Sequence, residues 1–191
     1  MNVSISKLFD QARSHNGFHP EDVSDATINE LYEMLKWGPT ATNCCPARFI
    51  FVKSPEAKSK LLDCMNPGNV DKTTQAPLAV IIGMDMKFYE TLPRIFPHYD
   101  SSSWFIGRPE KIYATALRNS SLQGAYLMLA ARVLGLDCGP MSGFNAEKVD
   151  EAFWAGTDVK TNFIVNIGVG DSSKLHPRGP RLAFEEACQI A

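Results

Sequence analysis

The stretch that most constrains the fold spans residues 110–134, where a helical pattern is apolar or small on most of its sides. Positions that show this are Ala114, Leu117, Ala125, Met128 and Ala130. Gly135 follows and suits a helix C-terminus, because glycine readily adopts the left-handed conformation used there. A helix with so little polar surface has to be covered by other elements, so we predict a central buried helix.

Shorter helices and strands are predicted on both sides of this helix. Ser24, Ser54 and Asn145 each precede a helical pattern and are residues that favour helix N-caps. The run "APLAVIIGM" is almost unbroken apolar, as expected of a strand buried on both faces. Mixed prolines and aromatics over residues 87–108 indicate a long irregular excursion. The predicted helices cover residues 24–37, 54–65 and 146–153, the strands 48–52, 76–84 and 162–170, and a turn 66–68.

Composition narrows the classes of partner. The chain has 191 residues, 45% of them hydrophobic, and a formal net charge of −2, which suits one α+β domain over residues 1–191 and gives no basic excess for nucleic acid. No apolar window approaches the ~18 residues that cross a membrane. The five cysteines form no Cys-x-x-Cys pair and the start lacks a secretion pattern, so we expect a cytoplasmic protein that acts on a small molecule.

Several common catalytic motifs fail on spacing. Gly168 and Gly170 follow a strand, but no helix pattern opens after them as a dinucleotide fingerprint requires. Ser142 stands in "GPMSGF", which is not a nucleophile elbow, and no metal-binding motif is present, so we expect no metal. Cys44 and Cys45 leave a thiol-based redox protein open, although adjacent side chains on an extended segment point apart and at most one can line a site.

Polar segments distributed over almost the whole chain point to one ligand instead. "ARSHNGF", "GPTATNCCP", "GNVDKTTQAP" and the pair "GPMSGF" and "RGPRL" resemble, in order, the flavin-binding segments of the nitroreductase-type FMN oxidoreductases. Within that family, "KWGPTATNCCPAR", "RNSS" and "LGLDCGPMSGF" are similar to stretches of the malonic semialdehyde reductases of the Rut uracil-degradation pathway. The resemblance implies a nitroreductase-like α+β fold, with a mostly antiparallel central sheet flanked by helices, in an intertwined homodimer with FMN at the subunit interface.

The resemblance also implies how FMN is held. Guanidinium groups and a hydroxyl suit a phosphate, and Arg13, Ser14 and Arg181 supply them. Asn69 and Lys72 match the family's pair at the pyrimidine edge of the flavin, where a cation eases reduction because negative charge collects there. The matched FMN positions are Arg13, Ser14, Asn16, Pro39, Thr40, Asn43, Asn69, Lys72, Pro140, Ser142, Gly143, Arg178 and Arg181.

The chain departs from the family pattern at three phosphate positions. Ala12 stands where the family's first motif arginine would be, and Asn16 where another basic residue is usual. The C-terminal lysine of the family falls at Gly179, so Arg178 is the residue available to compensate. These changes leave the exact set of phosphate ligands open.

The segment 39–43 corresponds to a family loop that reaches the FMN of the other subunit, so we expect it to form a wall of the partner's site. Cys45 occupies a position where the broader family often has glutamine, a change that matches the Rut-like branch and needs no redox role. Ser142 stands where the wider family often has glutamate, which leaves more room or less negative charge near the flavin.

The activity that the resemblance implies is ping-pong hydride transfer from NADH or NADPH through FMN, with 3-oxopropanoate reduced to 3-hydroxypropanoate in pyrimidine catabolism. Arg94, His98 and Arg108 qualify by residue type to hold a carboxylate or protonate an alkoxide. Two alternatives remain. One is a reductase of nitroaromatics, quinones or other electrophiles, which the aromatic Trp104 would suit, and the other is a flavin-binding protein without catalysis.

Overall fold

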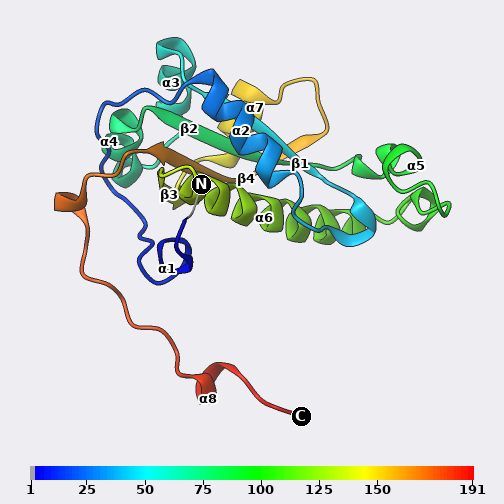
Figure 1. Ribbon diagram of the computed structural model, residues 1–191. Coiled ribbons are helices and arrows are strands. Elements are labelled where there is room, and N and C mark those ends of the chain that lie inside the picture. Colours follow the sequence, from blue (N-terminus) through cyan, green and yellow to red (C-terminus); the bar gives the residue numbers. More distant parts are fainter. Residues whose placement is uncertain (1–2) are drawn as a thin grey trace.

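A computed structural model describes residues 3–191 (Figure 1). Four strands form one antiparallel sheet in the order β1-β2-β4-β3. The strands are β1 Ala47–Val52, β2 Leu78–Asp85, β3 Asp137–Met141 and β4 Val159–Gly168. The predicted α+β class with an antiparallel sheet is therefore confirmed, and β2 and β4 lie in the middle of that sheet.

One face of the sheet is covered by α2 (Asp25–Leu35) and the long helix α6 (Pro109–Val133). Leu127, Ala130 and Ala131 of α6 are buried in one cluster with strand residues such as Val80 and Val165. The predicted central buried helix is α6, which is buried on its sheet-facing side but not all round. Elsewhere on α6 the apolar side chains of Tyr113, Leu122 and Tyr126 are exposed.

The other face of the sheet is covered by α3 (Pro55–Leu62), α4 (Pro67–Gln75) and α7 (Ala146–Phe153). Ser24, Ser54 and Asn145 cap α2, α3 and α7 as predicted, each accepting a hydrogen bond from a first-turn amide. The predicted turn at residues 66–68 is instead the start of α4. Asn66 is its N-cap, and Pro67 tolerates the first helical position because it lacks the amide that would be unsatisfied there.

Sequence patterns missed the strand β3 (Asp137–Met141). Its Gly139 and Pro140 disfavour strand structure, but β3 lies at the edge of the sheet, where a missing amide costs no ladder bond. Strand β4 also begins at Val159 rather than at residue 162. Both differences extend strand structure into segments for which no strand was predicted.

The irregular excursion holds only short turns, including α5 (Leu92–Ile95), and the N-terminal arm carries the single-turn helix α1 (Ile5–Leu8). After β4 the chain leaves the body as an extended tail with the short helix α8 (Phe184–Ala187), and its C-terminus lies well away from the sheet (Figure 1). Leu182, Phe184 and Ile190 on this tail are exposed. Within residues 3–191, no helix has the length and apolarity needed to cross a membrane.

Candidate functional site

The N-terminal arm is bonded to the edge strand β3. The backbone amide of His15 donates to the carbonyl of Cys138 over 2.9 Å. Gly139 makes this approach possible, since a Cβ atom there would lie 2.5 Å from the carbonyl oxygen of His15. The side chain of His15 is buried, with Nε2 3.3 Å from Oδ1 of Asp137. Arg13 and Ser14 are thereby fixed relative to the sheet.

The start of α4 meets the chain just after β3. The side-chain amide of Asn69 donates to the carbonyl of Gly143 over 2.7 Å, and the backbone amide of Asn66 donates to the same oxygen over 3.0 Å. A Cβ atom on Gly143 would lie 2.5 Å from Nδ2 of Asn69. Lys72 lies one turn further along the helix, and partial burial lowers the pKa of its ammonium group. Two predicted cofactor segments are therefore in direct contact.

The N-terminal arm and the C-terminal segment are hydrogen-bonded to each other and line a hollow of about 690 Å³. The guanidinium of Arg13 donates to the carbonyl of His176, and that of Arg178 donates to the carbonyl of Ala12 over 3.0 Å. Predicted phosphate ligands that line the hollow are Arg13, Ser14, Asn16, Arg178 and Arg181. Residues from opposite ends of the sequence thus share one cavity.

The hollow is strongly cationic. Arg132, near the end of α6, also lines it and donates to the carbonyl of Leu8 over 2.8 Å, a position for which no sequence motif gave a signal. Asp10 is the only acidic side chain among its lining residues. One guanidinium nitrogen of Arg181 donates to the carbonyls of Gly179 and Pro180, and the other guanidinium N–H groups remain as donors. Such a donor set suits an anion with several acceptor oxygens, such as a phosphate.

Thr40 and Asn43 lie elsewhere, on a loop near the start of α6. The amide of Ala41 donates to Oδ1 of Asn119 on α6 over 2.8 Å. The side chain of Asn43 donates to the carbonyl of Ile95 over 2.8 Å, which ties the loop to α5. Pro39 and Asn43 are exposed and Thr40 is half-buried. None of the predicted loop residues lines the cationic hollow.

The loop and the hollow are separated along α6. Asn119 contacts the loop, whereas Arg132 lines the hollow, and about 20 Å of helix axis lies between them at about 1.5 Å per residue. In Figure 1 the loop between α2 and β1 lies at the end of the molecule near α5, while α4, β3 and α1 gather at the other end. One chain therefore does not bring all the predicted FMN residues together.

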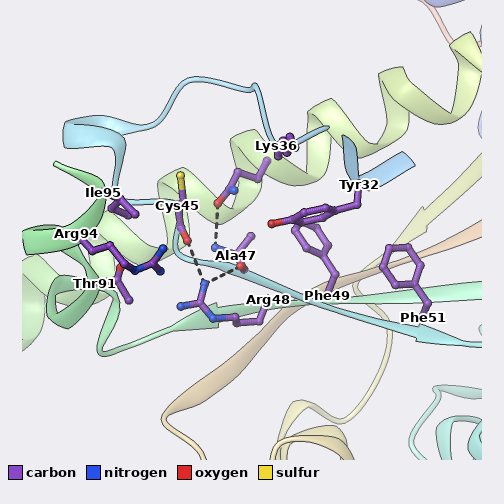
Figure 2. Close-up of a pocket in the computed structure, with 11 residues that line it drawn as sticks. Tyr32, Lys36, Cys45, Ala47, Arg48, Phe49, Phe51, Thr91, Arg94 and Ile95 are labelled. Carbon is purple, nitrogen blue, oxygen red and sulfur yellow. Dashed lines mark hydrogen bonds between the residues drawn. The ribbon is translucent and has the colours of Figure 1, made fainter. Parts of the chain in front are cut away.

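A second hollow of about 570 Å³ lies beside the loop (Figure 2). Arg94, Cys45 and Arg48 are among its lining residues, and Arg48 pairs with Asp85 while also donating to the carbonyls of Cys45 and Ala47. In Figure 2 the Arg94 guanidinium extends toward Arg48 and Cys45. Among residues 3–191, Arg94 makes no ion pair.

The other predicted substrate residues also lie in the excursion rather than at the cationic hollow. His98 packs edge-on against Phe96 with ring centroids 5.9 Å apart, and its side chain is exposed. Trp104 is partly exposed, and Arg108 is the N-cap residue of α6. Arg94, His98, Trp104 and Arg108 therefore belong to the loop end of the molecule, and none of them contacts the predicted phosphate residues.

The two adjacent cysteines have different surroundings. Cys44 is buried, and desolvation raises the pKa of its thiol to about 12, so it stays protonated at neutral pH. Cys45 is half-buried and lines the second hollow. All five cysteines are free, and within the described part of the chain no cluster of three or more His, Cys, Asp or Glu side chains suits a metal ion.

Solved structures with a similar fold include proteins named as reductases. A protein from Exiguobacterium sibiricum, provisionally named a nitroreductase and solved with FMN, superposes with a TM-score of 0.88 at 19% identity, covering 100% of this chain and 99% of its own. An enone reductase of gut-bacterial fatty acid saturation metabolism gives a TM-score of 0.87 at 20% identity, covering 99% and 98%. These likenesses establish the nitroreductase fold.

The family itself follows from sequence comparison. The model of the nitroreductase family matches residues 10–170, so this chain belongs to that family. A Polynucleobacter asymbioticus protein is 57% identical over 187 residues, which are 98% of this chain and 95% of that protein. A Stenotrophomonas maltophilia protein is 57% identical over 189 residues, covering 99% and 96%. Both relatives carry the provisional name NADH dehydrogenase/NAD(P)H nitroreductase.

Proposed function

We propose that this protein is an FMN-dependent NAD(P)H oxidoreductase whose site is completed by a second copy of the chain. The observation that carries the proposal is the cationic hollow, where the N-terminal arm and the C-terminal segment meet beside β3. Membership of the nitroreductase family and the FMN-bound structural neighbour support the choice of ligand. The cytoplasmic location expected from five free cysteines is part of the same proposal.

The residues present fit FMN in two respects. Gly139 and Gly143 let the arm and α4 pack directly against the β3 segment, which brings the predicted cofactor segments together. Arg13, Ser14 and Arg181 on the hollow would hold the phosphate through charged hydrogen bonds. Ala12 and Gly179 carry no cationic group, whereas Arg178 and Arg132 supply the positive charge nearby.

Bound FMN would supply a centre that accepts a hydride and passes it on. Lys72 would place its ammonium at the pyrimidine edge, and because this side chain is partly buried, which lowers its pKa, its field there would be less screened. Asn69 is fixed by Gly143 and would complete that edge with the free carbonyl oxygen of its side chain. Pro140 and Ser142 are exposed on the same β3 segment, where they would border the ring.

A homodimer is needed because the loop residues cannot reach the hollow of their own chain. Exposed apolar residues on α6 are Tyr113, Leu122 and Tyr126, and the tail presents Phe184 and Ile190. Such surfaces are typical of protein interfaces. In this arrangement Pro39, Thr40 and Asn43 of one subunit would border the cofactor held by the other.

The physiological acceptor that we propose is 3-oxopropanoate, reduced to 3-hydroxypropanoate in pyrimidine catabolism. The support is the resemblance of the loop, the "RNSS" stretch and "LGLDCGPMSGF" to the Rut-type reductases. Arg94 carries a guanidinium without an ion-pair partner in the described chain, which suits a small carboxylate. His98 and Arg108 remain proposed as a proton donor and a second cation.

A reductase of nitroaromatics or quinones is the second candidate function. The observation in its favour is the name of the relatives at 57% identity, and the exposed ring of Trp104 would suit a flat acceptor. The two functions share the cofactor and the electron donor, and they differ only in the acceptor.

The experiment that tests the proposal is visible absorption of the purified protein, reconstituted with FMN, before and after anaerobic NADH or NADPH. We expect a flavin spectrum that bleaches with at least one nucleotide and recovers when 3-oxopropanoate is added. Recovery with a nitroaromatic compound alone would favour the second function. A bound flavin that neither nucleotide reduces would indicate a non-catalytic flavin-binding protein, and failure to take up FMN would contradict the proposal outright.

A further inference from the structure

The stretch "RNSS" in α6 has no assigned part in cofactor or substrate binding, yet its asparagine is almost completely buried. Asn119 is 1% exposed and uses both ends of its side-chain amide. Its Oδ1 accepts from the backbone amide of Ala41 over 2.8 Å, and its Nδ2 donates to the carbonyl of Thr115 over 2.8 Å. The second bond fixes the orientation of the amide, so the acceptor is aimed at the loop.

A second buried amide lies one helical turn further along α6. Gln123 is 5% exposed, and its Oε1 accepts from the backbone amide of Ala47 over 2.9 Å. Residues four apart on a helix lie on the same side, so Asn119 and Gln123 form a pair. They hold the loop at its beginning, Ala41, and at the first residue of β1.

The backbone between these two points is strained. Thr42, Asn43 and Cys45 have φ values of 50°, 52° and 37°, in the left-handed region that side chains other than glycine rarely adopt. A β-branched residue such as Thr42 is especially unfavourable there. Strained backbone of this kind persists only where the surroundings hold it in place.

We propose that Asn119 is a positioning residue, which with Gln123 clamps the strained loop so that it is already in shape when it meets the partner's cofactor. The inference rests on the proposed function, in which Thr40 and Asn43 border the FMN of the other subunit. A loop that is ordered before binding loses less conformational entropy on binding, so the clamp contributes to cofactor affinity without touching the cofactor.

Two variants remove the same hydrogen bond from opposite sides. Asn119→Ala removes the acceptor, and Ala41→Pro removes the donor without altering α6. Proline suits this position because Thr40 has φ −134° and ψ 154°, the extended conformation favoured before proline, and Ala41 is the first residue of its turn. Asn162→Ala is the matched control, since Asn162 bonds Ser120 and Ser121 of α6 but not the loop.

Two readouts follow for each variant. We expect Asn119→Ala and Ala41→Pro to raise the Kd for FMN about tenfold, because the loosened loop then has to be ordered when FMN binds, and Asn162→Ala to leave it unchanged. In the protein without FMN, hydrogen exchange at the amides of Cys44 and Cys45 should quicken in both loop variants, because these amides bond Ala41 and Thr40 within the loop.

A Kd within about twofold of the wild type in both variants, or unchanged exchange at Cys44 and Cys45, would overturn the positioning role. Failure of the wild-type protein to take up FMN would count against the proposed function instead, and the exchange data would still decide whether Asn119 clamps the loop. Comparison of Asn119→Ala with Ala41→Pro separates the hydrogen bond from any general loosening of α6.

Discussion

The segments packed near the two ends of α6 hold their backbone in place in different ways. At the hollow end, the arm, α4 and β3 meet through glycines, so the backbone comes close without unusual dihedral angles at Gly139 or Gly143. At the loop end, three residues other than glycine adopt left-handed backbone, and the buried amides of Asn119 and Gln123 hold the segment. A site can thus be preformed in two ways. Glycines let backbone segments pack closely, or hydrogen bonds hold a strained backbone in place.

This difference bears on function because each end meets a different demand. In the proposed function the hollow end holds a charged group, and its Arg13 and Arg178 guanidinium groups donate to backbone carbonyls of the C-terminal segment and the arm. In the proposed function the loop end presents a fixed shape to another chain, and the strained backbone held by Asn119 and Gln123 would provide that shape. Variants at the two ends should therefore fail in different ways.

The largest effect is expected from the arginines of the hollow. Arg13→Ala and Arg181→Ala should each weaken FMN binding by about 1.5–3 kcal/mol, the range for hydrogen bonds to charged groups. Lys87→Ala is the control, since Lys87 pairs with Asp158 outside the hollow. Titration with FMN followed by flavin fluorescence measures the effect, and unchanged affinity in both arginine variants would remove the phosphate assignment.

The close approach of the arm to β3 can be broken by a single methyl group. Gly139→Ala should lower the free energy of unfolding by about 1–3 kcal/mol, because the added Cβ would lie 2.5 Å from a backbone oxygen that has no flexible end. Gly68→Ala, where nothing lies within 4 Å of the added atom, should be neutral or stabilising. Urea denaturation compares the two, and equal stability of both variants would contradict the account of the arm.

Introducing a glycine should stabilise the loop end, whereas replacing a glycine should destabilise the hollow end. Thr42→Gly should raise the free energy of unfolding by about 0.5–1 kcal/mol, since relief of left-handed strain exceeds the entropic cost of glycine. The same variant should bind FMN less tightly, because a relaxed loop is less ordered. Thr74→Gly, in the regular helix α4, is the control and should be destabilising. A Thr42→Gly protein that is also destabilised would show that the loop is not strained.

A smaller effect is expected from the partly buried cation at the hollow end. Burial lowers the pKa of Lys72, so between its native pKa and the unfolded value of about 10.4 the unfolded chain binds more protons, and stability rises with pH. Lys72→Met removes this pH dependence. It also removes the free-energy cost of the partly buried charge, which is present at pH values below the native pKa. The variant should be slightly more stable at pH 7, with a smaller gain at pH 10, and should slow flavin reduction more than it lowers FMN occupancy.

Urea denaturation at the two pH values and stopped-flow reduction by NADH or NADPH measure these effects. Each value is compared with the wild type at the same pH, because the buried thiols of Cys44 and Cys138 change stability in the opposite sense. Their raised pKa values mean that stability falls as pH rises above about 8.5, where the unfolded thiols ionise. A normal rate of flavin reduction in Lys72→Met would contradict its proposed role.

The smallest effect is expected from Cys45, the half-buried member of the cysteine pair. Cys45→Ser should keep reductase activity within about twofold, because the hydride chemistry needs no thiol and serine preserves a small polar side chain. Steady-state turnover with NADH or NADPH measures it, with Cys188→Ser, on the exposed tail, as the control. Loss of activity in Cys45→Ser alone would revive the thiol-based alternative.

Much of the fold was predictable because its signals are local. The caps at Ser24, Ser54 and Asn145 and the apolar run of β2 each lie within a few residues of the structure they specify. Strand β3 was not predictable from propensity, since its pairing with β4 and its edge position override the preferences of Gly139 and Pro140.

The candidate site was only partly predictable for the same reason. Arg13 and Arg181 carry charges whose chemistry suggests a phosphate, but their shared hollow depends on contacts between the two ends of the chain. The hydrogen bond between Asn119 and the loop could not be predicted from the sequence, since nothing around Asn119 indicates its partner in the loop. Thr42 likewise gives no local sign of left-handed backbone, because the clamp overrides its preference.

The central claim, that each site combines the hollow of one subunit with the loop of the other, is tested by counting FMN in mixed dimers. One subunit would carry Arg13→Ala with Arg181→Ala, and the other Thr40→Ala with Asn43→Ala, at an FMN concentration that leaves both variant homodimers empty. If the loop serves the partner, one site of the mixed dimer is intact and one FMN is bound per dimer. If the loop serves its own subunit, both sites are damaged and the mixed dimer stays empty, which would contradict the account.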